Sequence, residues 1–153
     1  MTTPESRIAE LGLTLPPVPA PVASYVPVVQ TGNLVFTSGQ LPLVDGALSI
    51  TGKVGAEVSV EEANALARFC VLNAIAAVKA EIGELSRVRR IVKVVGFVAS
   101  APDFSSQPLV VNGASEVLSA VFGDKGVHAR SSLGVAVLPL DAPVEIELIV
   151  EVE

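Results

Sequence analysis

Hydrophobic residues recur along the chain with two different periods, and the change from one period to the other predicts its elements. Across residues 63–78 apolar side chains return at every third or fourth position, which is the spacing of one helix face. Ser59 and Glu62 match a capping box at the start of this helix, and Gly83 suits its end. Residues 88–99 are instead rich in β-branched side chains, which favours a strand.

The remaining segments continue an alternation of strands and helices. Residues 31–33 form a plausible tight turn between two short strands, and Pro108 suits the first turn of a second helix. Residues 43–58 hold three glycines and little periodicity, which is typical of a loop. The further expected elements are strands at 25–29 and 34–37, a helix at 108–121, a turn at 123–126 and two C-terminal strands.

This order of elements, β-β-α-β-α-β-β, predicts an α+β sandwich in which a single sheet carries both helices on one face. The 153 residues are expected to form a single domain, with residues 1–23 as an N-terminal extension. In that extension a short helix or arm over 5–11 precedes the proline-rich segment 15–21, which should run extended along a surface. The other face of the sheet needs a cover, and a second subunit is the obvious candidate.

Composition narrows the range of functions. Half of the residues are hydrophobic and only 17% are charged, a mild argument for a homo-oligomer that hides apolar surface. The net charge of −6 disfavours binding to nucleic acid, and the basic cluster at 87–90 is expected to be a solvated patch. The single Cys70 excludes an intramolecular disulfide and is expected to be a buried thiol. No signal peptide or membrane span is apparent, so a cytoplasmic protein is expected.

The most informative polar residue is Arg130, within the strand-like stretch His128-Ala129-Arg130-Ser131-Ser132. Strand residues alternate between faces, so residues 127–138 form a mostly apolar face and a face that is small apart from His128, Arg130 and Ser132. A guanidinium above small residues has room for a planar carboxylate, which accepts two parallel hydrogen bonds. We therefore interpret Arg130 as an anchor for a small carboxylate ligand. The alternative is an ion pair with a glutamate across a hairpin.

Three further residues offer polar groups to such a ligand. Glu145 shares a strand face with Glu147 and Glu151, and is either part of a solvated face or a general base that holds a water. Ser38 and Gly39 follow a strand and offer a hydroxyl and an unhindered backbone N–H. The alternative for these two is an ordinary turn.

Three other residues have more open roles. Tyr25 either lines a site or fills a core or an interface. Asn112 falls within the second helix, where it caps, sits exposed or points into a cleft. The lone His128 has no nearby carboxylates or thiols, so no metal site is predicted and the residue is interpreted as structural.

The two charged candidates have a defined separation if the last two strands form a tight hairpin through residues 138–143. Glu145 then lies near Ala136, and Arg130 lies six residues further along, roughly 20 Å away at the rise of a strand. In that register the two side chains share a site only when they come from different chains. An active site between subunits is therefore an expectation that depends on the hairpin.

Taken together, these residues resemble the RidA (YjgF) family, also described as perchloric-acid-soluble proteins or reactive-intermediate deaminases. The matching segments are Tyr25-Val26, Gly32-Asn33, Thr37-Ser38-Gly39-Gln40-Leu41-Pro42, Asp103-Phe104, Asn112, Glu116, Ala129-Arg130-Ser131, Leu138-Pro139 and Val144-Glu145-Ile146-Glu147. They run in order from about Tyr25 to the end of the chain. The Ser-Gly-Gln block and the tail from the arginine to the glutamate are together quite specific.

The resemblance implies a chorismate-mutase-like α+β fold assembled as a homotrimer with three clefts between subunits. It also implies hydrolysis of short-lived enamines and imines, such as 2-aminoacrylate and 2-iminopropionate, to 2-keto acids and ammonia, without a metal or organic cofactor. In that reaction Arg130 would bind the substrate carboxylate and Glu145 would position or activate the attacking water. The substrate-binding residues implied in this way are Arg130, Ser38, Gly39, Tyr25, Asn112 and Ser132.

The chain departs from the family pattern at two positions beside the arginine. Ser132 stands where archetypal members carry a cysteine, and His128 replaces the usual proline. Two other functions stay open. One is an endoribonuclease, which the acidity of the chain disfavours. The other is a protein that binds a small keto acid without converting it.

Overall fold

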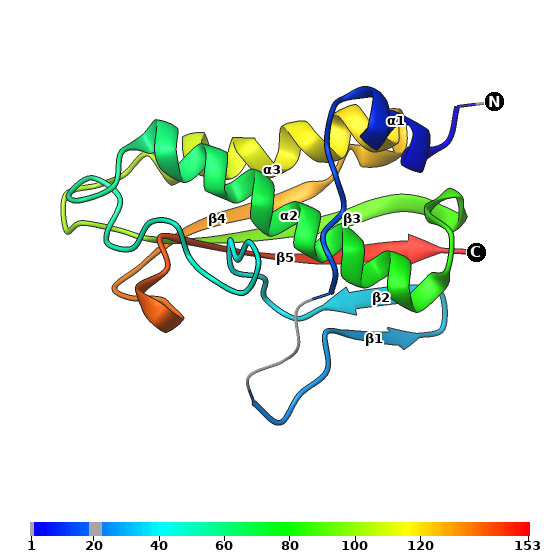
Figure 1. Ribbon diagram of the computed structural model, residues 1–153, viewed down its shortest axis with the longest axis horizontal. Helices are drawn as coiled ribbons and strands as arrows, with labels where there is room; N and C mark the ends of the chain where they lie inside the picture. Colours follow the sequence, from blue (N-terminus) through cyan, green and yellow to red (C-terminus); the bar gives the residue numbers. More distant parts are fainter. Residues whose placement is uncertain (1, 19–22) are drawn as a thin grey trace.

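The computed structural model describes residues 2–18 and 23–153, and these form one mixed sheet with long helices on one side (Figure 1). The strands are β1 (Val28–Thr31), β2 (Leu34–Thr37), β3 (Val88–Ala99), β4 (Ala129–Val135) and β5 (Val144–Val152). The helices are α1 (Pro4–Glu10), α2 (Val60–Ile82) and α3 (Gln107–Phe122), with short 3₁₀ turns η1 (Leu85–Arg87), η2 (Gly123–Gly126) and η3 (Pro139–Asp141). The expected fold class, a single mixed sheet with two long helices on one face, is confirmed.

The ends of α2 follow from local chemistry. The Ser59 hydroxyl accepts a hydrogen bond from the Glu62 amide, and the Glu62 carboxylate accepts one from the Ser59 amide, which completes the predicted capping box. At the other end Gly83 has a φ of 89°, which a residue with a side chain rarely adopts. The predicted start and end of this helix are confirmed.

Close packing against α2 fixes the position of α3. A Cβ on Gly113 would lie 2.2 Å from the backbone oxygen of Asn64, so only glycine allows the two helices to approach so closely. The Asn64 side chain adds a hydrogen bond to the carbonyl of Leu109 at 2.9 Å. This contact holds α3 above the edge of the sheet formed by β3 and β4.

The order of strands in the sheet is β1-β2-β5-β3-β4. β4 pairs in parallel with β3, whereas β5 lies in the middle and pairs antiparallel with both β2 and β3. The tight hairpin between the two C-terminal strands is therefore a wrong prediction. The connection over 136–143 contains two prolines and the left-handed residues Leu140 and Asp141, so it carries the chain past β3 instead of turning back at once.

The first strand also begins later than predicted. β1 starts at Val28, and the segment before it contains Pro27, which has no N–H to offer a sheet ladder. Tyr25 consequently lies outside the sheet with 49% of its surface exposed. The turn at residues 31–33 and the bounds of β2 are confirmed.

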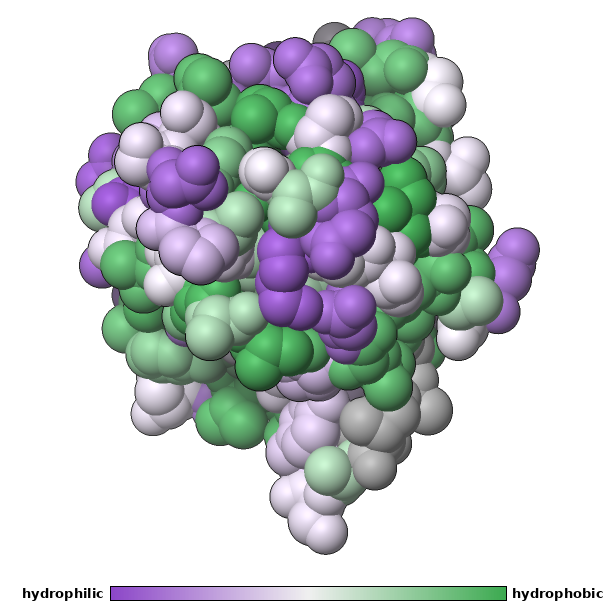
Figure 2. All heavy atoms as spheres, turned by 90° about the vertical axis from the view of Figure 1, so that its left-hand side faces the viewer, coloured by the Kyte–Doolittle hydropathy of each residue, from purple (hydrophilic) through white to green (hydrophobic). Residues whose placement is uncertain are grey.

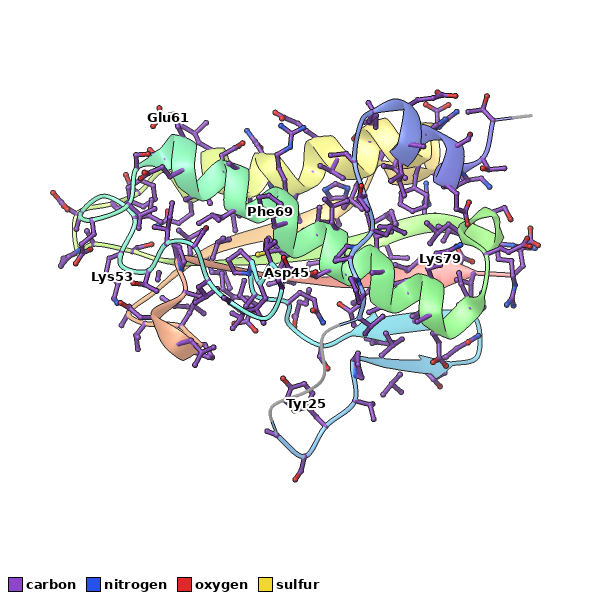
Figure 3. The ribbon with its side chains drawn as sticks, viewed as in Figure 1. Tyr25, Asp45, Lys53, Glu61, Phe69 and Lys79 are labelled. Carbon is purple, nitrogen blue, oxygen red and sulfur yellow. The ribbon has the colours of Figure 1, made fainter. Side chains whose placement is uncertain are left out.

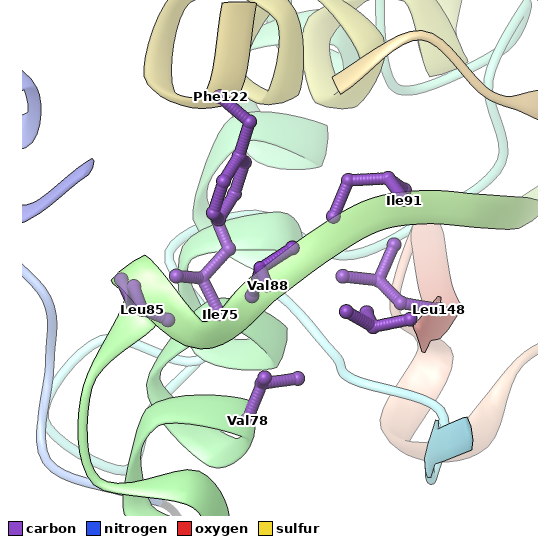
Figure 4. A pocket seen from close by; sticks show the side chains of 8 residues that line it. Ile75, Val78, Leu85, Val88, Ile91, Phe122 and Leu148 are labelled. Carbon is purple, nitrogen blue, oxygen red and sulfur yellow. The ribbon is translucent and has the colours of Figure 1, made fainter. Parts of the chain in front are cut away.

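The core lies between the sheet and the helices α2 and α3. Figure 4 shows a gap in it that is lined by apolar side chains, among them Ile75, Val88 and Leu148. This gap has no room for a water-sized sphere, so it is core packing rather than a binding site. Cys70 is fully buried here, as expected, and burial raises the pKa of its thiol well above the ordinary value.

The N-terminal extension packs onto the helical side of the domain. The short helix predicted over 5–11 is present as α1, and Ile8 belongs to the core. Glu5 accepts hydrogen bonds from Lys79 at 3.0 Å and from the Leu85 amide at 2.8 Å. Leu15 packs against the core, and residues 19–21 of the predicted proline-rich segment lie outside the described residues.

The face of the sheet away from the helices carries a mixture of apolar and acidic side chains. Phe36 and Leu133 are 39% and 46% exposed, and Glu147 lies on the same face at the centre of the sheet. Figure 2 views the end of the molecule near the start of α2, where hydrophobic and hydrophilic residues are interspersed. In the described part of the chain no helix is long and apolar enough to cross a membrane.

Candidate active site

Arg130 lies on the edge strand β4, and its side chain points toward α3. It is the register partner of Val94, which is completely buried on the helix-covered face. Its Nη1 donates to Asn112 Oδ1 at 2.8 Å and to Ser115 Oγ at 3.2 Å, and its Nη2 donates to the carbonyl of Pro108 at 3.5 Å. Positions 108, 112 and 115 share one face of α3, so all three hydrogen bonds to the guanidinium come from the same side of that helix.

All of these partners of Arg130 are neutral. The ion pairs found among the described residues join Lys53 to Asp141 and Lys79 to Glu5, and neither includes Arg130. The alternative of an ion pair across a hairpin is therefore wrong. Both hydrogens of Nη1 and one of Nη2 are used, whereas Nε has no partner within the described ranges. The N–H of Nε and the second hydrogen of Nη2 are therefore the donors left for a planar anion.

His128 and Ser115 extend this arrangement. His128 Nε2 lies 2.9 Å from Ser115 Oγ, and His128 Nδ1 lies 2.6 Å from the carbonyl oxygen of Gly126. Ser115 is not among the residues singled out by sequence. The signal that could have found it is its spacing of three from Asn112, which places both side chains on one helix face.

Ser132 projects from the same face of β4 as Arg130, because strand side chains alternate. Its register partner is Gly96, so no side chain from β3 covers it on that face. The Ser132 Oγ atom is buried and has no hydrogen-bond partner among the described residues. A buried hydroxyl without a partner costs roughly 1–3 kcal/mol, and a ligand that bonded to it would offset that cost.

Glu145 lies on β5 and belongs to the opposite face of the sheet. A Cβ on Gly39 would lie 2.0 Å from Glu145 Oε1, so only glycine leaves room for this carboxylate. Backbone hydrogen bonds between Gln40 and Ile146 hold the two segments together. Burial, with a smaller effect from the neighbouring Glu147, raises the pKa of Glu145 above its ordinary value.

Ser38 and Tyr25 are placed near this second group of residues. The Ser38 hydroxyl donates to the carbonyl of Val26 at 2.6 Å, which ties the end of β2 to the segment before β1. Tyr25 lies on that same segment, beyond the β1 edge of the sheet (Figure 3). Since β1 and β4 are opposite edges, Tyr25 is far from Arg130 within one chain.

The predicted residues thus form two groups that do not meet in one chain. We call Arg130, Asn112 and Ser132 the anion half-site and Glu145, Gly39 and Ser38 the carboxylate half-site. The register of β3 aligns Arg130 with Val94 and Glu145 with Phe97, and these two positions of β3 point to opposite faces. The hairpin from which a separation along one strand pair was expected is absent. The two side chains are instead kept apart within one chain because they lie on opposite faces of the sheet.

The basic cluster at 87–90 is compensated by acidic neighbours. A surface hollow of about 280 Å³ is lined by Arg89, Arg90 and Lys125 together with Asp124 and Glu151. The mixture of charges indicates a solvated patch, as the sequence predicts, and neither this hollow nor the gap in Figure 4 includes Arg130.

Comparisons with known proteins agree with this architecture. Residues 5–152 match the model of the family described as "YjgF/chorismate mutase-like, putative endoribonuclease". Protein TCP17 from Trypanosoma cruzi is 43% identical over 147 residues, which is 95% of this chain and 92% of that protein. A 2-iminobutanoate/2-iminopropanoate deaminase from Dermatophagoides farinae is 34% identical over 92% of this chain and 95% of its own length.

Similarity also extends to solved structures. The crystal structure of a putative endoribonuclease from Shewanella oneidensis MR-1 has a TM-score of 0.96 to this chain and 37% sequence identity. The match covers 99% of this chain and 100% of that one. The fold, including the N-terminal extension, is therefore shared almost in full.

Proposed function

We propose, since the chain belongs to the YjgF/chorismate mutase-like family, that it hydrolyses small carboxylate-bearing imines and enamines to 2-keto acids and ammonia. 2-Iminopropionate and 2-aminoacrylate are the type of substrate intended. A 34% identical relative is named 2-iminobutanoate/2-iminopropanoate deaminase, which supports this reaction class.

The observation that carries the proposal is the open edge of Arg130. A cation held only by neutral groups keeps its full charge for a ligand, whereas a carboxylate partner would have neutralised it. The N–H of Nε and the Nη2 hydrogen that is not given to Pro108 match the two oxygens of a planar carboxylate. Ser132 Oγ, which is buried on the same face without a partner, supplies a further hydrogen bond to the substrate.

The complete site is proposed to form between subunits of a homotrimer. The anion half-site of one chain then faces the carboxylate half-site of the next, with Tyr25 and Asn112 lining the cleft. This arrangement is supported by the separation of the two half-sites onto opposite faces of the sheet. It is also supported by the exposed apolar residues of the uncovered face, such as Phe36 and Leu133.

The chemistry needs only orientation, a water molecule and a weak base. A protonated imine is already electrophilic at C2, and Arg130 holds it by its carboxylate. Glu145 takes a proton from the attacking water as the C–O bond forms and passes it to the nitrogen. The C–N bond then breaks, ammonia leaves, and the new hydroxyl gives its proton to the ionised Glu145 as the carbonyl of the keto acid forms. The raised pKa of Glu145, caused by burial and then by Glu147, suits this exchange.

The test is to generate 2-iminopropionate with an amino-acid oxidase and follow its decay with wild type, Arg130→Ala and Arg89→Ala. Arg89 is an exposed arginine in the charge-compensated patch and serves as the matched control. We expect Arg130→Ala to lose about a hundredfold in kcat/KM, since a bidentate charged hydrogen bond is removed, and the control to match wild type. Equal loss in both variants, or none in either, refutes the assignment.

The second candidate is an endoribonuclease, which the family description and the Shewanella relative suggest. The net charge of −6 works against it. RNA cleavage that persists through removal of trace nucleases and disappears in Arg130→Ala would favour this candidate. Binding of pyruvate without acceleration of imine decay would favour a non-catalytic binding protein instead.

A further inference from the structure

A directed chain of hydrogen bonds leads from the backbone to the guanidinium of Arg130. It runs from the Gly126 carbonyl through both ring nitrogens of His128 and through the hydroxyl of Ser115. The elements that meet here are α3, η2 and β4, which follow one another along the chain, and β4 is held in the sheet by its parallel pairing with β3. Each distance along the chain lies between 2.6 and 3.2 Å.

For a neutral His128 ring, the direction of every bond follows from the groups involved. A carbonyl oxygen only accepts, so His128 Nδ1 carries the proton and donates to Gly126. In the neutral ring Nε2 is then the acceptor, and the Ser115 hydroxyl donates to it. The oxygen of Ser115 is left with its lone pairs for the N–H of Arg130. His128 Nδ1, the Ser115 hydroxyl and Arg130 Nη1 each donate once along this path.

We infer that Ser115 and His128 are positioning residues that orient the Arg130 fork toward its carboxylate ligand. The inference rests on the proposed function and deepens it. Together with Asn112, Ser115 occupies both hydrogens of Nη1, which fixes the plane of the guanidinium. The Nε and Nη2 edge is then presented in one orientation, so less freedom is lost when the ligand binds.

His128 acts through Ser115 and not on the ligand itself. Both of its ring nitrogens are engaged, one by the backbone and one by the serine. A residue in this position sets the affinity for the carboxylate rather than the rate of the chemical step. We therefore expect its loss to raise KM and to leave kcat nearly unchanged.

The first experiment measures the protonation of the His128 ring nitrogens by NMR and needs no catalytic turnover. His128 is the chain's single histidine, so ¹⁵N-histidine labelling yields one pair of ring nitrogen signals. We expect the pattern of a neutral ring protonated at Nδ1, and a shift of the Nε2 signal when pyruvate is added. The shift should be absent in Arg130→Ala. A ring protonated only at Nε2, or signals that ignore pyruvate while it binds, overturns the inference.

The second experiment separates positioning from folding. Ser115→Ala is expected to raise KM for 2-iminopropionate about fivefold, the effect of one lost hydrogen bond, while Ser115→Thr restores it. Ser119→Ala is the matched control, because Ser119 is an exposed serine on the same helix. The double variant of Ser115→Ala with His128→Ala should be no worse than either single one, since both break the same chain.

The outcomes distinguish this inference from the function on which it rests. If Arg130→Ala has wild-type activity, the proposed function fails. If Arg130→Ala is impaired but Ser115→Ala and His128→Ala keep the wild-type KM, the function stands and the positioning role is refuted. A KM increase that Ser115→Thr does not reverse also counts against it, because the hydroxyl is then not the cause.

Discussion

The two half-sites treat charge in opposite ways. Around Arg130 the protein places an amide, a hydroxyl and a carbonyl, so the cation is fixed in direction but not neutralised. Glu145 is partly buried and lies near a second carboxylate, that of Glu147. Both effects disfavour the negative charge of Glu145 and raise its pKa. The first arrangement suits the recognition of an anion, and the second suits the exchange of a proton. Each half-site offers what the other lacks.

Under the proposed function, neither half-site is complete by itself. An arginine without an acid has no means of moving a proton, and a protonatable acid has no means of holding a carboxylate. Gly39 keeps the space beside Glu145 clear, since a Cβ there would overlap its Oε1. We therefore expect the anion half-site to govern the affinity for the carboxylate ligand and the carboxylate half-site to govern the rate of hydrolysis.

The largest effect is expected for Glu145→Gln. An amide cannot take a proton from water, so kcat for imine hydrolysis should fall by about a thousandfold, within the range for general base catalysis. The Kd for pyruvate should change much less, because the anion half-site is intact. Calorimetric titration and imine decay measure the two quantities. A loss of pyruvate binding equal to the loss of kcat would contradict the division between the half-sites.

The next effect is expected for Arg130→Lys. A lysine keeps the charge but lacks the planar fork, so KM should rise roughly tenfold while kcat falls less. The measurement is steady-state decay of 2-iminopropionate at several concentrations. Full activity in this variant would show that charge alone is sufficient and that bidentate geometry is not used.

A smaller effect is expected for Glu147→Gln, read from the pH profile of kcat. Turnover should rise with pH through the pKa of Glu145, since the base must be ionised. That pKa is raised mainly by burial and additionally by Glu147, so removing the second carboxylate should lower it. The acidic limb of the profile then shifts to lower pH. An unmoved limb would mean that Glu145 is not the titrating group.

The smallest effect on activity is expected for Glu5→Gln, which lies far from both half-sites. Partial burial acts to raise the pKa of Glu5, but hydrogen bonds from Leu85 and Lys79 outweigh it, and the net pKa lies below the ordinary value. The carboxylate therefore stabilises the fold above its unfolded pKa, and this contribution is lost as pH falls through the folded pKa.

We expect Glu5→Gln to lower the free energy of unfolding by about 1 kcal/mol at neutral pH. The difference from wild type should shrink under acidic conditions, and activity per folded molecule should stay constant. Thermal unfolding across the acidic range measures the effect. A difference that persists unchanged at low pH would contradict the role of the ionised carboxylate.

Much of the molecule is predictable from short stretches of sequence. The capping box at Ser59 and Glu62, the glycine at position 83 and the β-branched run 88–99 specify elements through contacts within a few residues. Arg130 and Glu145 stand out for the same reason, because a charged residue within a strand pattern is visible locally. Ser115 is harder to find, because apart from its spacing from Asn112 its proposed role depends on His128 and Arg130, which lie elsewhere in the chain.

By itself the sequence determined the fold class and most element boundaries, because periodicity and capping act over short range. It also singled out Arg130 and Glu145 as candidate site residues. Only the tertiary structure decided that β5 lies between β2 and β3, and that β4 pairs in parallel with β3. Strand order depends on which edges meet after the helices have packed, and no local pattern encodes that choice. The same choice turns Arg130 toward α3 and Glu145 away from it.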